Sequence, residues 1–368
     1  MKIKYVLIII ILLTLACNGY KYYLENFDEV SPKLIMLSDM APSTKTIVVP
    51  TLEAEIEDGK NIVYCSTFQM VWTDMCKNIL KGTAEITDAP EYVNDLNVQI
   101  AKNPAITDES CYYVKTGYGK DNIVKIIESE FLKKFRYPCQ ESSYFRKAGP
   151  RDIVAYAYLY KNLPFNNKYK KISGHTFLSG NKTFSVKAFG VPRFDKSELK
   201  LYKEQVRIVY CDSNRIPKNF IIVLNTKYLT DEVVISTLKP QSTMAKTYNN
   251  IQTYFKKDMK EKFDQDASLI VPCIDFEILQ SYDKLKSKLI LNKTAEGYQI
   301  TTSIQGIKFK LNEKGVTLKS FSLIVASTGI SKDFYVNGPF VIYMKEKQAD
   351  YPYFMAYIAN DELLVKSN

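Results

Sequence analysis

The chain has 368 residues, of which 46% are hydrophobic and 24% are charged, and its formal net charge is +10. This composition excludes a disordered or fibrous protein, and the length is sufficient for a sizeable hydrophobic core. The positive charge is spread along the whole chain, and the densest basic segment is only YKNLPFNNKYKK, so we expect no nucleic-acid partner.

The N-terminus has the pattern of an export signal. Its first 16 residues, MKIKYVLIIIILLTLA, combine a basic start with an apolar stretch that is too short to cross a bilayer comfortably. We therefore predict a signal peptide over residues 1–16. The ending LTLAC resembles a bacterial lipoprotein signal, in which the cysteine becomes the lipidated first residue. Lipidation at Cys17 and ordinary cleavage nearby both stay open. Either one predicts a secreted or outer-surface protein, with a membrane contact only through such a lipid.

The remaining cysteines and the single histidine indicate no catalytic or metal site. Six cysteines stand at long, irregular spacings without a CxxC pair, which is typical of neither a zinc site nor a small disulfide scaffold. We expect most of them to be buried. His175 follows a glycine in ISGHTF, a pattern typical of a solvated turn, and no hydrolase, HExxH or phosphate-binding motif accompanies it. The sequence predicts no enzyme, no metal and no cofactor.

Two helices are expected in the first half. Residues 17–45 are predicted to form an irregular lead-in, followed by a strand at TIVVP. Apolar residues from Phe68 to Ile79 then recur at helical spacing, with Ser66 and Gln69 as an expected capping box and Gly82 as the stop. A second helix is expected over DNIVKIIESEFLKKF. The next segment, IVAYAYLYKN, is rich in strand formers and predicts a strand covered on both faces.

Most of the remaining chain is predicted to form strands, with one helix at TYNNIQTYFKKDMKEKF. The predicted strands are KTFSVKAFGV, QVRIVYCD, NFIIVLNT, SLIVPCIDFEIL, GYQITTSIQGIKFKLN, GPFVIYMKE and YPYFMAYIAN. No repeat or linker interrupts them, so we predict one domain over residues 46–365. A helical first half and a strand-rich second half indicate an α+β fold.

The C-terminal third resembles the serpin family. The segment IKFKLNEKG is similar to the strand and hinge before the serpin reactive loop, with Glu313, Lys314 and Gly315 in the family's order. The segments GPFVIYMKE and YPYFMAYI are similar to the paired strands that close the serpin core, where Pro339 and Phe340 match a Pro-Phe pair. Pro339 lies 26 positions after Glu313, about the span of a serpin reactive loop and its following strand. Weaker similarity extends over residues 45–360.

The resemblance implies a large mixed β-sheet, a second sheet or barrel region, and an exposed reactive loop over residues 315–335. In an inhibitory serpin, cleavage of this loop lets its first half enter the sheet as an added strand. Leu318 replaces a normally tiny residue of the hinge, at an overpacking cost of ~1 to 3 kcal/mol. The family's hinge falls on Glu313, Lys314, Gly315, Val316, Leu318 and Ser320, and its scissile region on Val325, Ala326, Ser327, Thr328, Gly329 and Ile330.

Two functions follow from the resemblance, and both stay open. The first is a monomeric suicide inhibitor of serine or cysteine endopeptidases; because the scissile region holds no Lys or Arg, its target would prefer small or apolar residues. The second is a non-inhibitory serpin-fold protein for binding or surface display. The bulky hinge favours it, as does an altered region beneath the sheet. There the family's polar switch residues correspond to Cys65, Phe68, Ala155 and Gln305, which predicts a largely apolar region.

Overall fold

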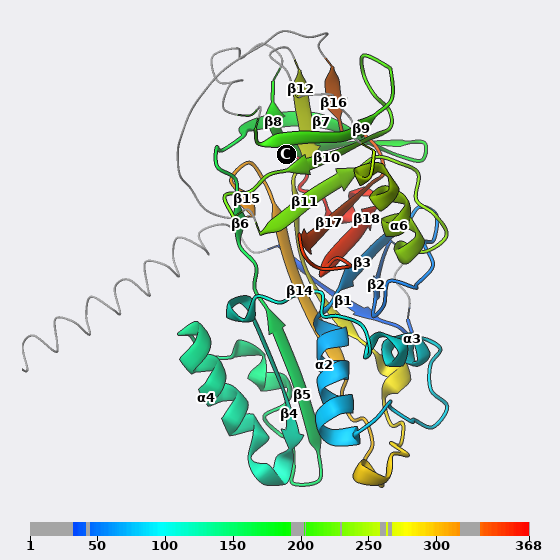
Figure 1. Cartoon of the computed structure of the whole chain (residues 1–368), viewed down its shortest axis with the longest axis vertical. Coiled ribbons are helices and arrows are strands. Elements are labelled where there is room, and N and C mark those ends of the chain that lie inside the picture. Colours follow the sequence, from blue (N-terminus) through cyan, green and yellow to red (C-terminus); the bar gives the residue numbers. More distant parts are fainter. Residues whose placement is uncertain are drawn as a thin grey trace, which may run out of the picture.

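The computed structural model describes residues 32–41, 45–192, 202, 204–228, 230–257, 263, 267–316 and 332–367. Strands of several sheets fill the upper part of the molecule, and helices α2 and α4 flank the long strands β4 and β5 in the lower part (Figure 1). Helices and sheets are therefore segregated, and the predicted α+β class is confirmed.

The helices are α2 (Thr67–Met75, continued by a π-helical turn over Cys76–Leu80), α3 (Tyr92–Gln99), α4 (Ile123–Phe135) and α6 (Met244–Phe255). The strands of the seven-stranded sheet, in spatial order, are β2 (Thr46–Val49), β3 (Asn61–Cys65), β18 (Phe354–Ile358), β17 (Phe340–Glu346), β11 (Asp231–Ser236), β10 (Phe220–Leu224) and β9 (Val206–Cys211). A four-stranded sheet has the order β16 (Asp333–Tyr335), β12 (Ser268–Pro272), β8 (Lys182–Val191) and β7 (Lys170–Ser179). The remaining strands are β1 (Leu34–Ser38), β13 (Ile274–Ser281) and β14 (Ile304–Leu311) in one sheet, β4 (Tyr112–Tyr118) with β5 (Ile153–Leu159), and β6 (Leu163–Pro164) with β15 (Gly315–Val316).

Strand β10 runs through the centre of the main core. All five residues of its sequence FIIVL are buried, because each face of the strand has its own cover. Ile221 and Val223 pack in the cluster of helix α6, while Phe220 and Ile222 pack in the cluster shared with β8 and β12. Full burial of such a side chain stabilises the fold by about 1.5 to 3 kcal/mol. Helix α6 forms in the predicted segment but begins three residues earlier, at Met244, where the Thr243 side chain caps it by accepting from the Lys246 N–H.

Helix α2 forms where the apolar spacing predicts it, but the prediction of a capping box at Ser66 and Gln69 is wrong. Ser66 has helical dihedral angles and its side chain makes no capping hydrogen bond. The Gln69 Nε2 instead donates to the Leu96 carbonyl at 3.0 Å and to Thr73 Oγ1 at 3.1 Å. Gln69 is buried, so its amide serves a tertiary contact to α3 in place of a local cap. At the other end, Lys81 adopts the left-handed conformation next to Gly82.

Helix α4 covers one face of β4 and β5 with an aromatic cluster. Phe131 is fully buried against Tyr156 and Tyr158 of β5, with ring centroids 6.2 and 5.0 Å away. The prediction that β5 is covered on both faces is confirmed, because Val154 and Tyr156 pack in the cluster of α4 while Ile153 and Ala155 pack against the cluster around α2. Only Val154 and Tyr156 are buried, and the other side chains of the strand are half-buried.

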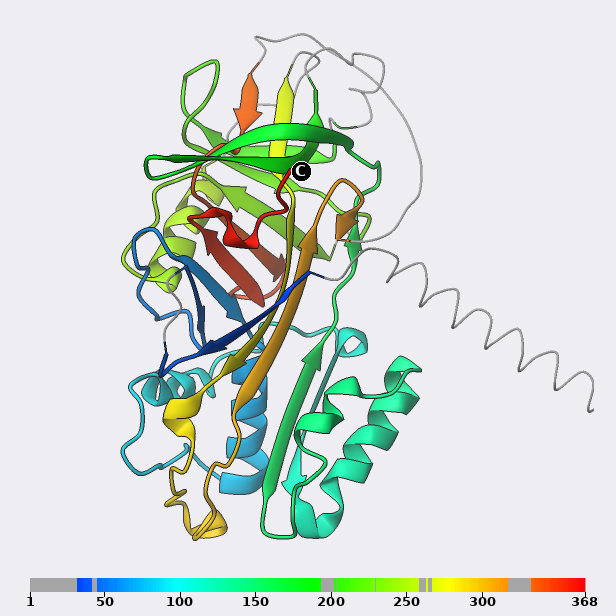
Figure 2. The same cartoon turned by 180° about the vertical axis from the view of Figure 1, so that it is seen from behind.

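The predicted irregular lead-in contains a strand. Residues Leu34–Ser38 form β1, which pairs in parallel with β13, from Leu34 beside Glu277 to Ser38 beside Ser281. This corrects the expectation of irregular structure over residues 17–45 for that segment. Figure 2 shows β1 as the dark-blue strand that runs diagonally across the middle of the molecule. The other domain boundaries stay predictions.

The cysteines are interior residues, as expected. All six described cysteines are buried. Burial raises the pKa of Cys111 to about 11 and the pKa values of Cys76 and Cys273 to about 12, so these three stay protonated at neutral pH and are poor nucleophiles. Among the described residues, no helix is long and apolar enough to cross a membrane, and no three His, Cys, Asp or Glu side chains gather as metal ligands would.

Candidate functional site

Part of the predicted hinge, Gly315–Val316, forms the two-residue strand β15 at one side of the upper part of the molecule (Figure 1). Gly315 pairs with Pro164 and Val316 with Leu163, so β15 is antiparallel to β6. On its other side, the Gly315 N–H donates to the Asn312 carbonyl at 3.1 Å. Strand β15 therefore lies between β6 and the end of β14, with main-chain bonds to both.

Gly315 is the residue that allows this turn. Its φ is +110°, a conformation that residues with a side chain rarely adopt. A Cβ atom there would lie 2.4 Å from the Phe165 nitrogen and 2.8 Å from the Pro164 Cα. Because both obstacles are backbone atoms, neither can move aside cheaply. Only glycine fits at this position.

Glu313 anchors the turn between β14 and β15. Glu313 is 4% exposed, and its backbone carbonyl accepts from the Tyr169 N–H at 2.9 Å. The Oε1 atom lies 3.6 Å from Lys168 Nζ and 3.5 Å from Lys171 Nζ, but it accepts no hydrogen bond. A buried carboxylate needs such counter-charges, so the two lysines hold Glu313 in place. The neighbouring Lys314 is exposed, and its N–H donates to Asn312 Oδ1 at 2.9 Å.

Below β15, no strand of the described part of the chain lies between β5 and β14. Strand β5 pairs with β4, and β14 pairs with β13, but no ladder joins β5 to β14. Figure 2 shows the two strands converging toward β15 and separating below it. Among the described residues, the facing edges of β5 and β14 thus carry main-chain donors and acceptors that no neighbouring strand satisfies.

A polar network beneath the sheet corrects the prediction of an apolar region. Gln305 of β14 is 4% exposed, and its Nε2 donates to the Cys65 carbonyl at 3.0 Å and to Thr67 Oγ1 at 2.8 Å. Its Oε1 accepts from the Tyr282 O–H at 2.7 Å. Both ends of the amide are satisfied, so Gln305 fastens β14 to the start of α2. The expectation failed because the hydrogen-bond partners of Gln305 include Thr67 and Tyr282, which are not among the positions compared with the family. Phe68 and Ala155 do belong to the apolar cluster around α2.

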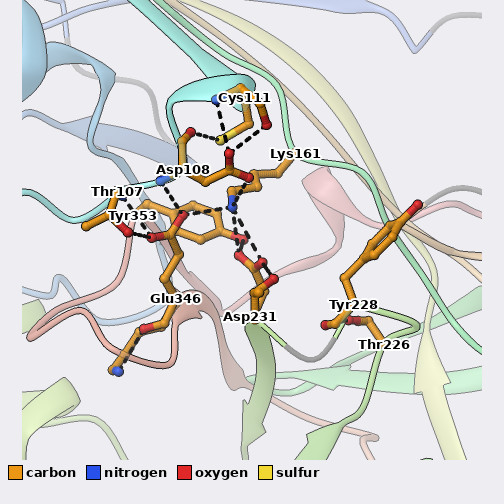
Figure 3. A network of polar contacts seen from close by, with 12 residues as sticks. Thr107, Asp108, Cys111, Lys161, Thr226, Tyr228, Asp231, Glu346 and Tyr353 are labelled. Atoms are coloured by element: carbon orange, nitrogen blue, oxygen red, sulfur yellow. Dashed lines mark hydrogen bonds and ion pairs between the residues drawn. The ribbon is translucent and has the colours of Figure 1, made fainter.

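A buried charged cluster holds the segment between β5 and β6, and sequence reasoning missed it (Figure 3). Asp231 and Glu346 face each other on β11 and β17, an arrangement of like charges that is destabilising by itself. Lys161 lies between them, with its Nζ 3.2 Å from Asp231 Oδ1 and 2.9 Å from Glu346 Oε1. All three side chains are at most 7% exposed. The only sequence signal was a lysine beside an apolar strand.

The same cluster reaches β4. Glu346 Oε2 accepts from the Thr107 N–H at 2.8 Å and from its hydroxyl at 2.7 Å. Tyr353 donates its O–H to Asp231 Oδ1 at 3.0 Å, and its ring lies 5.6 Å from Lys161 Nζ. Glu346 therefore ties both the chain before β4 and the end of β5 to the seven-stranded sheet.

Burial and charge oppose each other in this cluster. Burial by itself would lower the pKa of Lys161, but the hydrogen bond to Glu346 and the charge of Asp231 raise it above its usual value. Burial would likewise raise the pKa of Glu346, but hydrogen bonds from Lys161 and Thr107 hold it below its usual value. Lys161 and Glu346 are thus both charged at neutral pH.

His175 is not the solvated turn residue that the sequence predicts. It lies in β7, and its Nε2 is 2.9 Å from the Val336 carbonyl. Burial lowers the pKa of His175, so the ring is neutral at pH 7. His175 thus joins the hairpin of β7 and β8 to Val336, the residue after β16.

The rest of the predicted site lies outside the described residues. This holds for Leu318 and Ser320 of the hinge, for the lipidation site Cys17, and for the scissile region Val325, Ala326, Ser327, Thr328, Gly329 and Ile330. The structure thus describes the hinge only from Glu313 to Val316.

No protein-family model and no curated protein matches the sequence. Solved structures do align with it. Human thyroxine-binding globulin in complex with thyroxine aligns at 10% identity over 82% of this chain and 92% of its own, with a TM-score of 0.48. Serpin48 of the insect Tenebrio molitor aligns at 11% identity over 80% and 96%, with a TM-score of 0.44. The mouse protein-Z dependent protease inhibitor aligns at 11% identity over 83% and 91%, with a TM-score of 0.48.

All three alignments have TM-scores below 0.5 and identities of 10 to 11%. The resemblance to serpins therefore rests on the residues of the C-terminal third.

Proposed function

We propose that this protein is a serpin-like suicide inhibitor of serine or cysteine endopeptidases. The observation that carries the proposal is the position of β15, which already pairs with β6 on one side and with the end of β14 on the other. It has the place and direction of the first two residues of a strand added between them. Continued downward, the chain after Val316 would run between β5 and β14.

The added strand would be stabilised by main-chain hydrogen bonds on both sides. Each such bond contributes about 0.5 to 1.5 kcal/mol to stability. On the register that the serpin resemblance implies, Leu318 and Ser320 would face the core and Lys319 would point outward, because side chains of a strand alternate. No charge would be driven inward. The loop can therefore enter the sheet at the cost of accommodating Leu318.

The proposed partner is an extracytoplasmic protease that prefers small or apolar residues. The segment from Val325 to Ile330 offers such residues and no Lys or Arg. The export signal predicted over residues 1–16 places the inhibitor in the same compartment, secreted or held at the outer surface by a lipid on Cys17. In this role the protein is an inhibitor and performs no catalysis of its own.

A non-inhibitory binding protein of the same fold is the second candidate. Leu318 favours this second candidate, because its bulk would overpack the sheet and slow the insertion of the loop. If insertion is slow, the acyl-enzyme is hydrolysed before the protease is trapped. The contacts of Gln305 and Lys161 also favour it, since they fasten β14 and β5 in their present positions. Under this alternative the loop would be cut without trapping the protease.

The test is incubation with an elastase-like or subtilisin-like protease, followed by electrophoresis in SDS. We expect a band with the combined mass of protease and inhibitor fragment. Ser320→Arg, which would force a charge into the sheet, should yield only clipped chain. The matched change Lys319→Glu on the outward face should leave the complex intact. If the unmodified chain and a Leu318→Ala variant are both merely clipped, the inhibitory proposal is wrong and the binding protein remains.

A further inference from the structure

Strand β1 is the outer edge of its sheet in the described part of the chain. The sheet has the order β1-β13-β14, so one side of β1 pairs with β13 and the other side has no partner strand there. The Asp39 N–H donates to the Ser281 carbonyl at 3.1 Å. Because main-chain groups alternate in direction along a strand, those of Leu34, Met36 and Ser38 point away from β13.

This edge lacks the devices that usually protect an edge strand. The sequence LIMLS contains no charge, proline or glycine. Leu34 is 44% exposed and Met36 is 66% exposed, on the face opposite Ile35 and Leu37, which pack against the core. An open, apolar edge of this kind is a template for another strand.

We propose that β1 pairs with β1 of a second copy of this chain, antiparallel about a two-fold axis at Met36. In this register Leu34 lies opposite Ser38 of the partner, and Met36 lies opposite its own counterpart. These are the three residues whose main-chain groups point outward, so each pair exchanges two N–H···O bonds. The two three-stranded sheets become one continuous sheet. The interface is isologous, as a closed dimer requires.

Charge selects this register. It places Lys33 opposite Asp39 of the second copy, and the symmetry repeats this pair on the other side. Asp39 is held in position by the Tyr92 O–H at 2.9 Å and the Lys284 N–H at 3.1 Å. A shift by two residues in either direction would separate Lys33 from Asp39. It would also move Met36 away from its own counterpart.

The dimer is independent of the proposed function. Strand β1 and the free edge of β14 lie on opposite sides of the three-stranded sheet, so pairing leaves the place of the inserted loop open. A dimer differs from the monomer expected from the sequence.

The test uses the full chain in a mild detergent that covers its apolar N-terminal segment. Sedimentation or light scattering over a concentration series should show a monomer–dimer equilibrium. Met36→Lys places two ammonium groups opposite each other at the axis, and we expect it to raise the dissociation constant at least tenfold. Met40→Lys is the matched control, because Met40 is 67% exposed but lies outside β1; it should leave the dimer unchanged.

A spin label on Met36→Cys provides the geometric readout. The Cα atoms of a hydrogen-bonded antiparallel pair lie about 5.5 Å apart, so the two labels should broaden each other's spectra strongly. A label at Met40→Cys should show weaker broadening. The proposal is overturned if the unmodified chain stays monomeric throughout the series, or if Met36→Lys dimerises as well as the unmodified chain. Loss of binding to anionic lipid vesicles in Met36→Lys, with no dimer in the unmodified chain, would assign this edge to a membrane surface.

Discussion

Gly315 determines the geometry of the hinge at the level of a single residue. We expect Gly315→Ala to destabilise the protein by about 1 to 3 kcal/mol, since it combines a positive φ with a clash against the Phe165 backbone. Urea denaturation would measure the difference. Gly59→Ala is the control, because Gly59 also has a positive φ but nothing within 4 Å of a Cβ. Equal losses in the two variants would mean that the packing of β15 on β6 is unimportant.

Gln305 carries the network beneath the sheet. Gln305→Leu removes the partner of the buried Tyr282 hydroxyl, and leaving such a group unsatisfied costs about 1 to 3 kcal/mol. Thermal unfolding should show this loss, whereas Gln348→Leu on the surface should be nearly neutral. Adding Tyr282→Phe should recover part of the loss, because both polar partners are then gone. A double variant as unstable as the sum of the single ones would contradict the network.

Lys161 makes the stability depend on pH. The lowered pKa of Glu346 means that its contribution is present above its unfolded pKa and lost as the pH falls through the folded value. The raised pKa of Lys161 means that its contribution is lost only as the pH rises through the folded value, above about 10.4. The cluster should therefore stabilise the fold most between about pH 5 and pH 10.

Removing the lysine tests this balance. Lys161→Met leaves two buried carboxylates facing each other, which should cost about 3 to 5 kcal/mol at pH 7. The deficit should shrink below about pH 5 as the unpaired carboxylates take up protons. Denaturation at several pH values would measure it, with Lys115→Met, from an exposed pair, as the control. A deficit that does not change with pH would show that Lys161 acts through packing alone.

At the level of elements, helix α4 holds β4 and β5 together through aromatic contacts. Phe131 is fully buried in that cluster, and Phe131→Ala should cost about 3 to 5 kcal/mol. Leu132, its neighbour in sequence, is 48% exposed, and Leu132→Ala should cost far less. The comparison of denaturation midpoints checks this. Similar midpoints for the two variants would mean that α4 packs only loosely on the strands.

The elements that the sequence predicts well are those with a local signal. Helices α2, α4 and α6 show helical spacing over several turns, and most of the strands carry runs of apolar or alternating residues. Strand β1 was missed because five residues without alternation give no period, and its partner β13 lies some 240 positions away. Such a strand forms because it pairs with a distant strand at the edge of a sheet, and a local sequence pattern cannot reveal that pairing.

The candidate site also has one part that the sequence predicts and one part that it does not. The order of Glu313, Lys314 and Gly315 predicts the hinge through its resemblance to serpins, and the positive φ of Gly315 gives a physical reason for a glycine at that place. The clusters around Lys161 and Gln305 were not predicted. Their partners come from distant segments, and a lysine or a glutamine in a strand is usually an exposed residue.

At the scale of the whole molecule, β15 lies between β6 and the end of β14, and in the described part of the chain no strand lies between β5 and β14 below it. The chain after Val316 would fit there as an added strand. If the loop fills that place after cleavage, the added hydrogen bonds and buried side chains make the cleaved form the more stable one.

The melting temperature of the cleaved chain tests this claim most directly. A protease that cuts once within residues 317–331, with the site verified by mass spectrometry, should raise the melting temperature by on the order of 10 °C, because several added hydrogen bonds each contribute about 1 kcal/mol. Protection of the β5 and β14 amides from hydrogen exchange should rise with it. A cleaved chain that melts at or below the temperature of the intact chain would contradict the account.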